Sequence, residues 1–315
     1  MKPLIKQTIV IMGPTASGKS DLAILIARQY NGEIISADSR QVYRGMDIGT
    51  GKVSQDPIRI SEQENKNFFF SDGIRHHLID IASPKDVYNV THFVRDSLRA
   101  ITDIQQRGKT PIICGGTGFW IQALIDNQVF PAVKPDMKLR AILNIKSAEE
   151  LFTMLCEKDP ARAKAIDRQN KVRLIRALEI CQALGKVPRH QPSRINRQNF
   201  SIIALTLPQD ILYARIEKRL TERLRNGMIA EIHRLHEKDG ISWKRLESFG
   251  LEYRFGAKLL QQKISSEAMQ EELLQAIKHY AKRQMTWLKR FEKMGADIHW
   301  IQDPKEALKI IEKNK

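Results

Sequence analysis

The sequence contains no long uninterrupted hydrophobic run. None of its apolar stretches approaches the roughly 20 residues that a helix needs to cross a bilayer, so we expect no membrane partner. The first predicted strand begins at Thr8, which leaves little room before it for a signal peptide. We therefore expect a cytoplasmic protein.

Cysteine is scarce, and the few cysteines are scattered. There are three of them, and none belongs to a C-x-x-C pair. This spacing argues against both a cysteine zinc site and a disulfide framework, and it favours a reducing compartment. The residues are Cys114, Cys156 and Cys181.

Acidic residues are outnumbered. The chain has 52 Lys and Arg against 36 Asp and Glu, a net charge of +16. Half of this excess lies between residues 161 and 197, where ten basic residues accompany two acidic ones. A small metabolite does not need such a field, whereas a nucleic-acid backbone is attracted by it. A solvated basic face remains the alternative for this segment.

The most informative feature that is present is a phosphate-binding loop. The pattern G-x-x-x-x-G-K-[ST] is matched by Gly13, Pro14, Thr15, Ala16, Ser17, Gly18, Lys19 and Ser20. It lies between an apolar strand and a helix, where backbone N–H groups can converge on phosphate oxygens. Lys19 would add a positive charge and Ser20 a hydroxyl ligand for Mg²⁺. A glycine-rich turn without a ligand is the alternative.

Strands and helices alternate through the first third of the chain. Expected strands are Thr8–Met12, Glu33–Ala37, His77–Ile81 and Thr110–Gly115, and expected helices are Lys19–Arg28 and Val90–Arg107. This alternation predicts an α/β fold, a P-loop parallel sheet flanked by helices. Ligands of such sheets bind beyond the carboxyl ends of the strands. We therefore expect the phosphate loop and residues 36–39 and 115–118 to meet at one crevice.

The pattern changes after Asn127, where prolines interrupt helical stretches and no strand is expected until Phe200. We predict an inserted all-helical domain at 127–198 and a catalytic core made of 1–126 plus 199–315. The helical stretches of the insertion are Glu149–Glu157 and Val172–Leu184. The core would resume with strand Phe200–Thr206, helix Asp210–Arg225, strand Asp297–Ile301 and a helix that begins at Asp303 and Pro304.

Several charged residues are candidates for the site. Asp38 ends an apolar strand near the phosphate loop, which suits a general base, a magnesium ligand or a simple turn residue. Arg215 and Arg219 lie four residues apart, so they share a helical face and suit either a clamp on phosphate oxygens or a solvated surface. His76 and Asp80 are weaker candidates, because a carboxylate at the end of a strand is often structural.

These motifs together resemble the bacterial tRNA dimethylallyltransferase family. The resemblance is collinear from residue 8 to about 291 and rests on segments 13–20, 36–43, 45–50, 76–81, 115–118, 173–179, 215–219 and 281–290. The phosphate loop alone is generic. The run Asp38-Ser-x-x-x-Tyr43 and the run Ala281-Lys-Arg-Gln-x-Thr-Trp287 are much more specific.

The resemblance implies an enzyme that transfers a dimethylallyl group. Its donor would be dimethylallyl diphosphate, and its acceptor N6 of the adenine immediately 3′ of the anticodon in tRNA. The implied cofactor is Mg²⁺, held by Ser20, and the phosphate loop would bind the diphosphate. The implied catalytic residues are Asp38, Arg219, Lys19 and Thr117, of which Asp38 would accept the N6 proton.

The resemblance also implies residues that contact the tRNA, on the core and on the insertion. They are Asp38, Ser39, Arg40, Gln41, Thr117, Arg140, Val172, Arg173, Leu174, Ile175 and Arg176. The late basic helix would add Lys282, Arg283, Lys289 and Arg290 for phosphates, with Trp287 stacking a base or packing in the core. We expect a monomer.

Two segments depart from the family pattern. Ser54–Gly73 is longer than expected and contains an unexplained run, Phe68–Phe70. Gly250–Arg254 stands where a different turn is usual, so it receives no role.

Two other classes of function compete with this interpretation. One is a small-molecule or nucleotide kinase, with the insertion as a lid over ATP. The other is a nucleotide-switched RNA-binding protein, although the guanine-selecting run Asn-Lys-x-Asp does not occur. The net charge of +16 and the late basic helix argue against the kinase.

Overall fold

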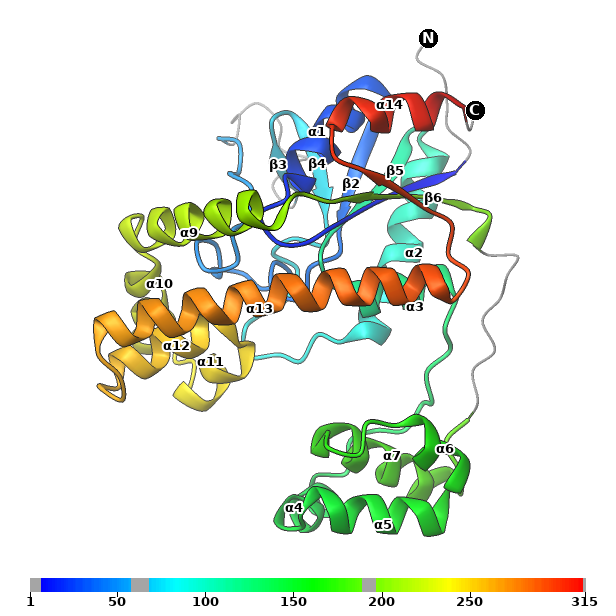
Figure 1. The fold of residues 1–315 in the computed structure, drawn as a ribbon, viewed down its shortest axis with the longest axis vertical. Coiled ribbons are helices and arrows are strands. Elements are labelled where there is room, and N and C mark those ends of the chain that lie inside the picture. Colours follow the sequence, from blue (N-terminus) through cyan, green and yellow to red (C-terminus); the bar gives the residue numbers. More distant parts are fainter. Residues whose placement is uncertain (1–6, 58–67, 189–196, 314–315) are drawn as a thin grey trace. The chain divides into compact units, whose positions relative to one another are not determined.

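The chain folds into two compact units, each formed by its own set of contacts (Figure 1). The computed structural model describes residues 7–57, 68–188 and 197–313. One unit comprises residues 1–127 and 193–315, and the other comprises residues 128–192. The predicted insertion ran from 127 to 198, and its last part includes residues 189–196, which lie outside the described residues.

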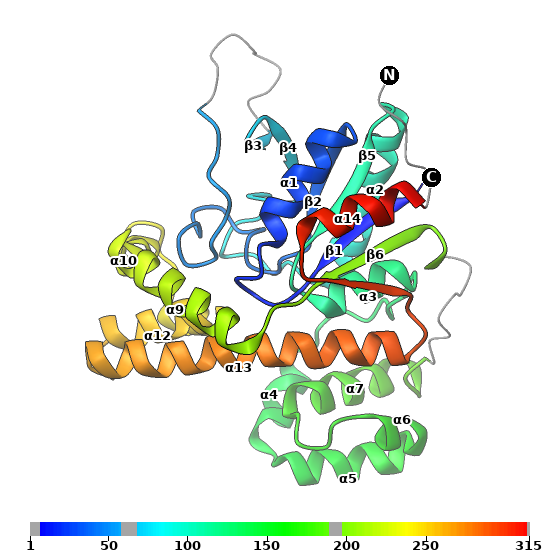
Figure 2. The same cartoon turned by 45° about the horizontal axis from the view of Figure 1, so that its top comes forward.

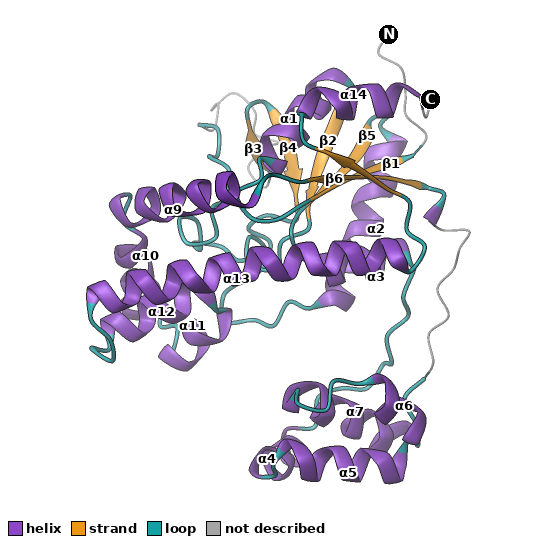
Figure 3. Cartoon of the chain, viewed as in Figure 1, coloured by secondary structure: helices purple, strands orange, loops and turns teal. Residues whose placement is uncertain are grey.

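The larger unit is built on a seven-stranded sheet whose order is β3-β4-β2-β5-β1-β6-β7. All strand pairs are parallel except β3 with β4 (Figure 3). The strands are β1 (Thr8–Met12), β2 (Gly32–Ser36), β3 (Phe69–Ser71), β4 (Ile74–His77), β5 (Thr110–Cys114), β6 (Phe200–Leu205) and β7 (Ile298–Ile301). The predicted P-loop α/β fold is therefore confirmed.

Alternating side chains of β1 pack against the layers on both faces of the sheet. Ile9 and Ile11 pack on one side, where α1 (Lys19–Gln29) and α14 (Pro304–Lys313) cover the sheet. Val10 and Met12 point to the other side. The helices that cover this second side are α2 (Val90–Gln106), α3 (Gly118–Ile125) and α13 (Ser266–Lys293) (Figure 2). The continuous apolar run Ile9–Met12 is what two covered faces require.

Four further helices lie alongside α13 in the larger unit (Figure 1). They are α9 (Gln209–Arg225), α10 (Met228–Glu237), α11 (Trp243–Phe249) and α12 (Leu251–Leu260). Gly227 separates α9 from α10 and adopts a positive φ of 94°, which a residue with a side chain rarely does. These helices bring residues from the C-terminal half of the chain to the carboxyl ends of the strands.

One strand prediction was wrong. We expected a strand at His77–Ile81, whereas β4 ends at His77, because Leu78 and Asp80 have positive φ angles of 62° and 56°. Strand β3 was not predicted, and it pairs with β4 through a tight turn at Asp72 and Gly73.

The hairpin of β3 and β4 accounts for part of the unexplained Phe68–Phe70 run. Phe69 is buried, and the guanidinium of Arg75 lies 3.5 Å from the centre of the Phe68 ring. Of the segment Ser54–Gly73, residues 58–67 lie outside the described residues.

Within its described residues 128–188, the smaller unit contains helices and no strand, as predicted, and the first helix begins at Met137. Its helices are α4 (Met137–Ile145), α5 (Ala148–Lys158), α6 (Pro160–Ala165) and α7 (Lys171–Leu184). Ser147 and Glu150 form a capping box at the start of α5, and Asp159 caps α6 with Pro160 at its first position. The core of this unit is made of Leu143, Leu151, Leu155, Leu174 and Leu178.

No helix within the described residues combines the length and the apolar character that crossing a membrane requires.

Candidate active site

The phosphate loop has the backbone conformation that its glycines make possible. Gly13 has a φ of 149°, and a Cβ atom there would lie 2.8 Å from the carbonyl oxygen of Leu205. Gly18 is left-handed and forms the N-cap of α1, so no side chain caps this helix end. The first N–H groups of a helix lack partners within it, and here they face the site as a cradle for an anion.

Lys19 lies inside this loop. Its Nζ donates a hydrogen bond to the carbonyl oxygen of Pro14 at 2.6 Å. Burial lowers its pKa from 10.5 to about 8, and Arg219 lowers the pKa further, whereas Cys114 and Asp38 act in the opposite direction. A bound anion would offset the cost of keeping this ammonium group charged.

Gln284 of α13 joins the phosphate loop to the loop after β5. Its Oε1 accepts the Thr15 N–H at 2.8 Å, and its Nε2 donates to the Gly116 carbonyl oxygen at 3.0 Å. Gln284 was not predicted as a site residue. The signal was a glutamine in the middle of the basic run 281–290, at a position that the helical period turns toward the core.

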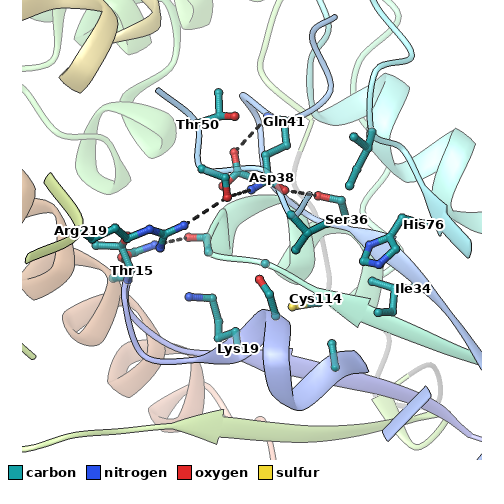
Figure 4. Close-up of a pocket in the computed structure, with 18 of the residues that line it drawn as sticks. Thr15, Lys19, Ile34, Ser36, Asp38, Gln41, Thr50, His76, Cys114 and Arg219 are labelled. Atoms are coloured by element: carbon teal, nitrogen blue, oxygen red, sulfur yellow. Dashed lines mark hydrogen bonds between the residues drawn. The ribbon is translucent and has the colours of Figure 1, made fainter. Parts of the chain in front are cut away.

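Asp38 follows β2 and is held by backbone donors. Its Oδ1 accepts the N–H of Arg40 at 2.8 Å and that of Gln41 at 3.4 Å. The N–H of Ser39 donates to the hydroxyl of Thr117 at 3.1 Å, which ties the end of β2 to the loop after β5. The carboxylate therefore has a fixed orientation beyond the carboxyl end of β2 (Figure 4).

Two arginines of α9 complete the site. Arg219 donates to the Gly51 carbonyl oxygen at 3.1 Å, and burial together with Arg223 lowers its pKa to about 10. Arg223 forms an ion pair with the buried Glu252 at 2.5 Å. The predicted partner of Arg219 was Arg215, which is exposed and does not line the cavity. The second arginine that lines the cavity is Arg223, one helical turn further along α9.

These groups line one cavity beyond the carboxyl ends of β1, β2 and β5 (Figure 4). The three strand ends that the sequence pointed to do meet there, as expected for an open parallel sheet. The polar lining is Thr15, Lys19, Ser20, Ser36, Asp38, Gln41, Thr50, His76, Arg219, Arg223, Tyr280 and Gln284.

The donor set of the cavity suits a cation that keeps most of its water. Ser20 and Asp38 offer oxygen atoms, and within the described residues no three His, Cys, Asp or Glu side chains form a metal-binding group. Mg²⁺ prefers oxygen ligands and is usually bound by one or two protein groups together with phosphate oxygens and water. The residues fit that ion.

In the helical unit, the residues that were predicted to contact RNA fall into three groups, which are ion-paired, exposed and buried. Arg140 and Arg176 both bind Glu179, whose side chain is 1% exposed. Burial would raise the pKa of Glu179, but its hydrogen bonds to Arg140 and Arg176 lower it to about 2. Through this carboxylate, Arg140 joins α4 to α7, and Arg176 pairs with it within α7. Val172 and Arg173 are exposed.

Leu174 and Ile175 require a correction. They were predicted to contact tRNA, but Leu174 is fully buried and Ile175 is 6% exposed, both in the core of the helical unit. Their side chains cannot serve as an RNA surface in this conformation.

The late basic helix is α13. Its Lys282, Arg283, Lys289 and Arg290 are exposed. Trp287 packs against Gly118 and Phe291. A Cβ atom on Gly118 would lie 2.3 Å from the Trp287 ring, and the ring centres of Trp287 and Phe291 are 5.1 Å apart. Of the two roles considered for this tryptophan, the structure supports packing.

Residues 41–291 match the family model described as IPP transferase. The chain belongs to the IPP transferase family. Among curated relatives, tRNA dimethylallyltransferase 1 of Syntrophus aciditrophicus is 42% identical over 307 residues, which is 97% of each chain. The tRNA dimethylallyltransferase 2 of Treponema denticola is 42% identical over 93% of this chain and 95% of its own length.

Solved structures of IPP transferases share the fold. The tRNA isopentenylpyrophosphate transferase of Bacillus halodurans superposes with a TM-score of 0.67 at 31% identity, over 98% of both chains. A eukaryotic dimethylallyltransferase, captured acting on tRNA, gives a TM-score of 0.72 at 26% identity over 94% of this chain and 74% of its own. These relatives favour prenyl transfer over the kinase.

Proposed function

We propose that this IPP transferase modifies tRNA. It transfers a dimethylallyl group from dimethylallyl diphosphate to N6 of the adenine 3′-adjacent to the anticodon, and it releases diphosphate. The observation that carries the proposal is that Asp38, Lys19 and Arg219 line a single cavity at the phosphate loop. This arrangement offers a proton acceptor and an anion cradle in one place, and the names of the relatives supply the substrates.

The chemistry requires one bond to form and one to break. The N6 nitrogen attacks the allylic carbon, and the C–O bond to the diphosphate breaks with its electron pair on oxygen. Asp38 accepts the proton that N6 loses. Lys19 and Arg219 stabilise the negative charge that develops on the leaving diphosphate. An adenine amine is a weak nucleophile, so holding it in line with the leaving group contributes strongly to the rate.

We propose Mg²⁺ as the cofactor, with Ser20 as a protein ligand and the diphosphate and water as the others. When bound, the ion neutralises charge on the leaving group. Asp38 lines the same cavity, so its role as base must be separated from a role in metal binding by experiment.

On the RNA side, we propose that Ser39, Arg40, Gln41 and Thr117 surround the target base. They come from the loops after β2 and β5 and are tied together by the bond between the Ser39 N–H and the Thr117 hydroxyl. An adenine that is stacked in a loop must be flipped out to reach Asp38. Arg173 and Val172 on the helical unit, together with the exposed cations of α13, would bind the surrounding RNA.

The direct test is the mass analysis of nucleosides from unmodified tRNA after incubation with the protein, Mg²⁺ and dimethylallyl diphosphate. We expect N6-dimethylallyladenosine, and only when all components are present. A parallel binding measurement with labelled ATP and labelled dimethylallyl diphosphate covers the alternatives. Tight binding of ATP without modified nucleoside would support the kinase or the nucleotide switch instead.

A further inference from the structure

The turn at Met46–Gly51 stands against the arginines of the site, and a buried carboxylate holds it in place. Glu231 of α10 is 7% exposed. It accepts the N–H groups of Asp47, Ile48 and Gly49 at 2.8, 2.7 and 3.1 Å. Three backbone donors on one carboxylate fix the course of the turn.

Tyr253 supplies a fourth donor to the same carboxylate. Its hydroxyl lies 2.7 Å from Glu231 Oε1, and its ring packs against Gly49, where a Cβ atom would lie 2.8 Å from the ring. The turn is thus fixed both by hydrogen bonds and by close packing, which only a glycine allows at this position.

A buried lysine anchors the far end of the turn. The side chain of Lys52 is 3% exposed. It donates to the Tyr43 carbonyl oxygen at 2.7 Å and pairs with the carboxylates of Asp47 and Asp80. Asp80, which the sequence marked as a weak candidate for the site, therefore has a structural partner outside the cavity.

Gly51 at the end of the turn meets both arginines of the site. Its carbonyl oxygen accepts Arg219 Nη2 at 3.1 Å and Gln41 Nε2 at 3.3 Å. A Cβ atom here would lie 2.4 Å from Arg219 Nη2 and 2.0 Å from Arg223 Nη2, and the residue has a positive φ of 61°. The path of the turn therefore determines where the two guanidinium groups lie.

The segment Gly250–Arg254, to which the sequence assigned no role, makes two contacts that stabilise the turn and the arginines. Tyr253 binds the carboxylate that holds the turn, and the neighbouring Glu252 forms an ion pair with Arg223. Both carboxylates involved are buried, so each must keep its partners to avoid the cost of an unpaired charge.

We propose that Glu231 is a positioning residue for the diphosphate end of the active site. It does not line the cavity; it acts through the turn, whose Gly51 carbonyl oxygen orients Arg219 and whose Gly51 backbone limits the position of Arg223. The proposal rests on the proposed function for the identity of the anion. The positions of the Arg219 and Arg223 guanidinium groups therefore depend on α10.

The test compares Glu231→Gln with Glu237→Gln, an exposed position on the same helix. The amide keeps the size of the side chain, but it can no longer accept from all its donors. We expect Glu231→Gln to bind inorganic diphosphate and dimethylallyl diphosphate roughly tenfold or more weakly by calorimetry, because a displaced binding group loses much of its effect. Glu237→Gln should bind like the wild type, and tRNA affinity should be unchanged in both.

A double-mutant cycle with Arg219→Ala identifies the route. If Glu231 acts through Arg219, Glu231→Gln should weaken diphosphate binding much less in the Arg219→Ala background than in the wild type. Tyr253→Phe removes one donor and should give a smaller loss of the same kind, which keeps the test available if Glu231→Gln does not fold.

Three results would overturn the proposal: unchanged diphosphate affinity in both Glu231→Gln and Tyr253→Phe, equal losses in both backgrounds, or a loss of thermal stability alone. A wild type that binds inorganic diphosphate but not the dimethylallyl ester would contradict the proposed function instead, and the cycle could still be measured with inorganic diphosphate.

Discussion

At the scale of the residue, the charge on Lys19 is the property most open to change. Its ammonium group is buried beside Arg219, and its pKa falls to about 8. A diphosphate in the loop would favour the charged form and raise this pKa back toward its ordinary value of 10.5. Lys19 therefore stays protonated to a higher pH in the complex than in the free enzyme.

Affinity for dimethylallyl diphosphate should therefore depend on pH. We expect it to be greatest below about pH 8 and to fall as the pH rises above the free-enzyme pKa, with one proton taken up on binding in that range. Calorimetry in two buffers of different ionisation enthalpy measures the uptake. Lys19→Ala should abolish the uptake and slow turnover on the order of a hundredfold. The same uptake in Lys19→Ala would assign the proton to another group.

The Asp38→Asn variant separates the base from the metal ligand. The amide keeps the shape of the side chain but cannot take the N6 proton. If Asp38 is the base, single-turnover transfer should slow by roughly 10²–10⁴ while both substrates bind near normally. The measurement is repeated across a Mg²⁺ titration. Recovery of the wild-type rate at high Mg²⁺ would show that the carboxylate serves the metal.

At the scale of the element, the local sequence predicts those helices and strands whose bounds are set by apolar runs and capping residues. Strand β1, the phosphate loop and helix α7 were expected within a residue or two of their observed bounds, because each is a continuous pattern with a clear start. Lys19 and Ser20 could be named for the same reason, whereas Leu174 and Ile175 on α7 were predicted to contact tRNA and are buried.

Contacts between residues that are distant in the sequence determine the features that local patterns did not predict. Arg219 has an arginine four residues away on either side, and helical period alone cannot choose between Arg215 and Arg223. Contacts with Glu252 and Gly51, distant in sequence, select Arg223. Strand β4 was misplaced for a similar reason, although the pair Asp72 and Gly73 is a hairpin signal that was available.

Helix α7 carries the prediction that belongs to this scale. Arg173→Glu changes an exposed residue, so it should weaken tRNA binding without lowering the melting temperature. Arg176→Glu places an acid beside the buried Glu179 and should destabilise the helical unit markedly. Thermal unfolding and tRNA binding are measured on both variants. Equal tRNA binding by Arg173→Glu and the wild type would indicate a solvated basic face.

At the scale of the whole molecule, the net charge of +16 favours binding to tRNA, and the number of phosphates that the basic residues contact should set the salt dependence. We expect the logarithm of tRNA affinity to fall steeply and linearly with the logarithm of salt concentration. Replacing the exposed Arg162, Lys164, Arg168 and Arg173 together by Gln should reduce that slope by up to about four. Binding of dimethylallyl diphosphate should remain the same in this variant, which serves as its control. An unchanged slope would place the RNA contacts elsewhere.

The expected monomer stays a prediction.

The chain order of the larger unit has a consequence for biosynthesis. Strand β1 pairs with β5, made before the helical unit, and with β6, made after it. The phosphate loop emerges first from the ribosome, but Arg219, Arg223 and Gln284 follow only after the insertion has been translated. A nascent chain that ends near Asn127 therefore carries the loop without the partners that complete it. Competence to bind the allylic substrate should arise only once α13 has left the exit tunnel, late in synthesis.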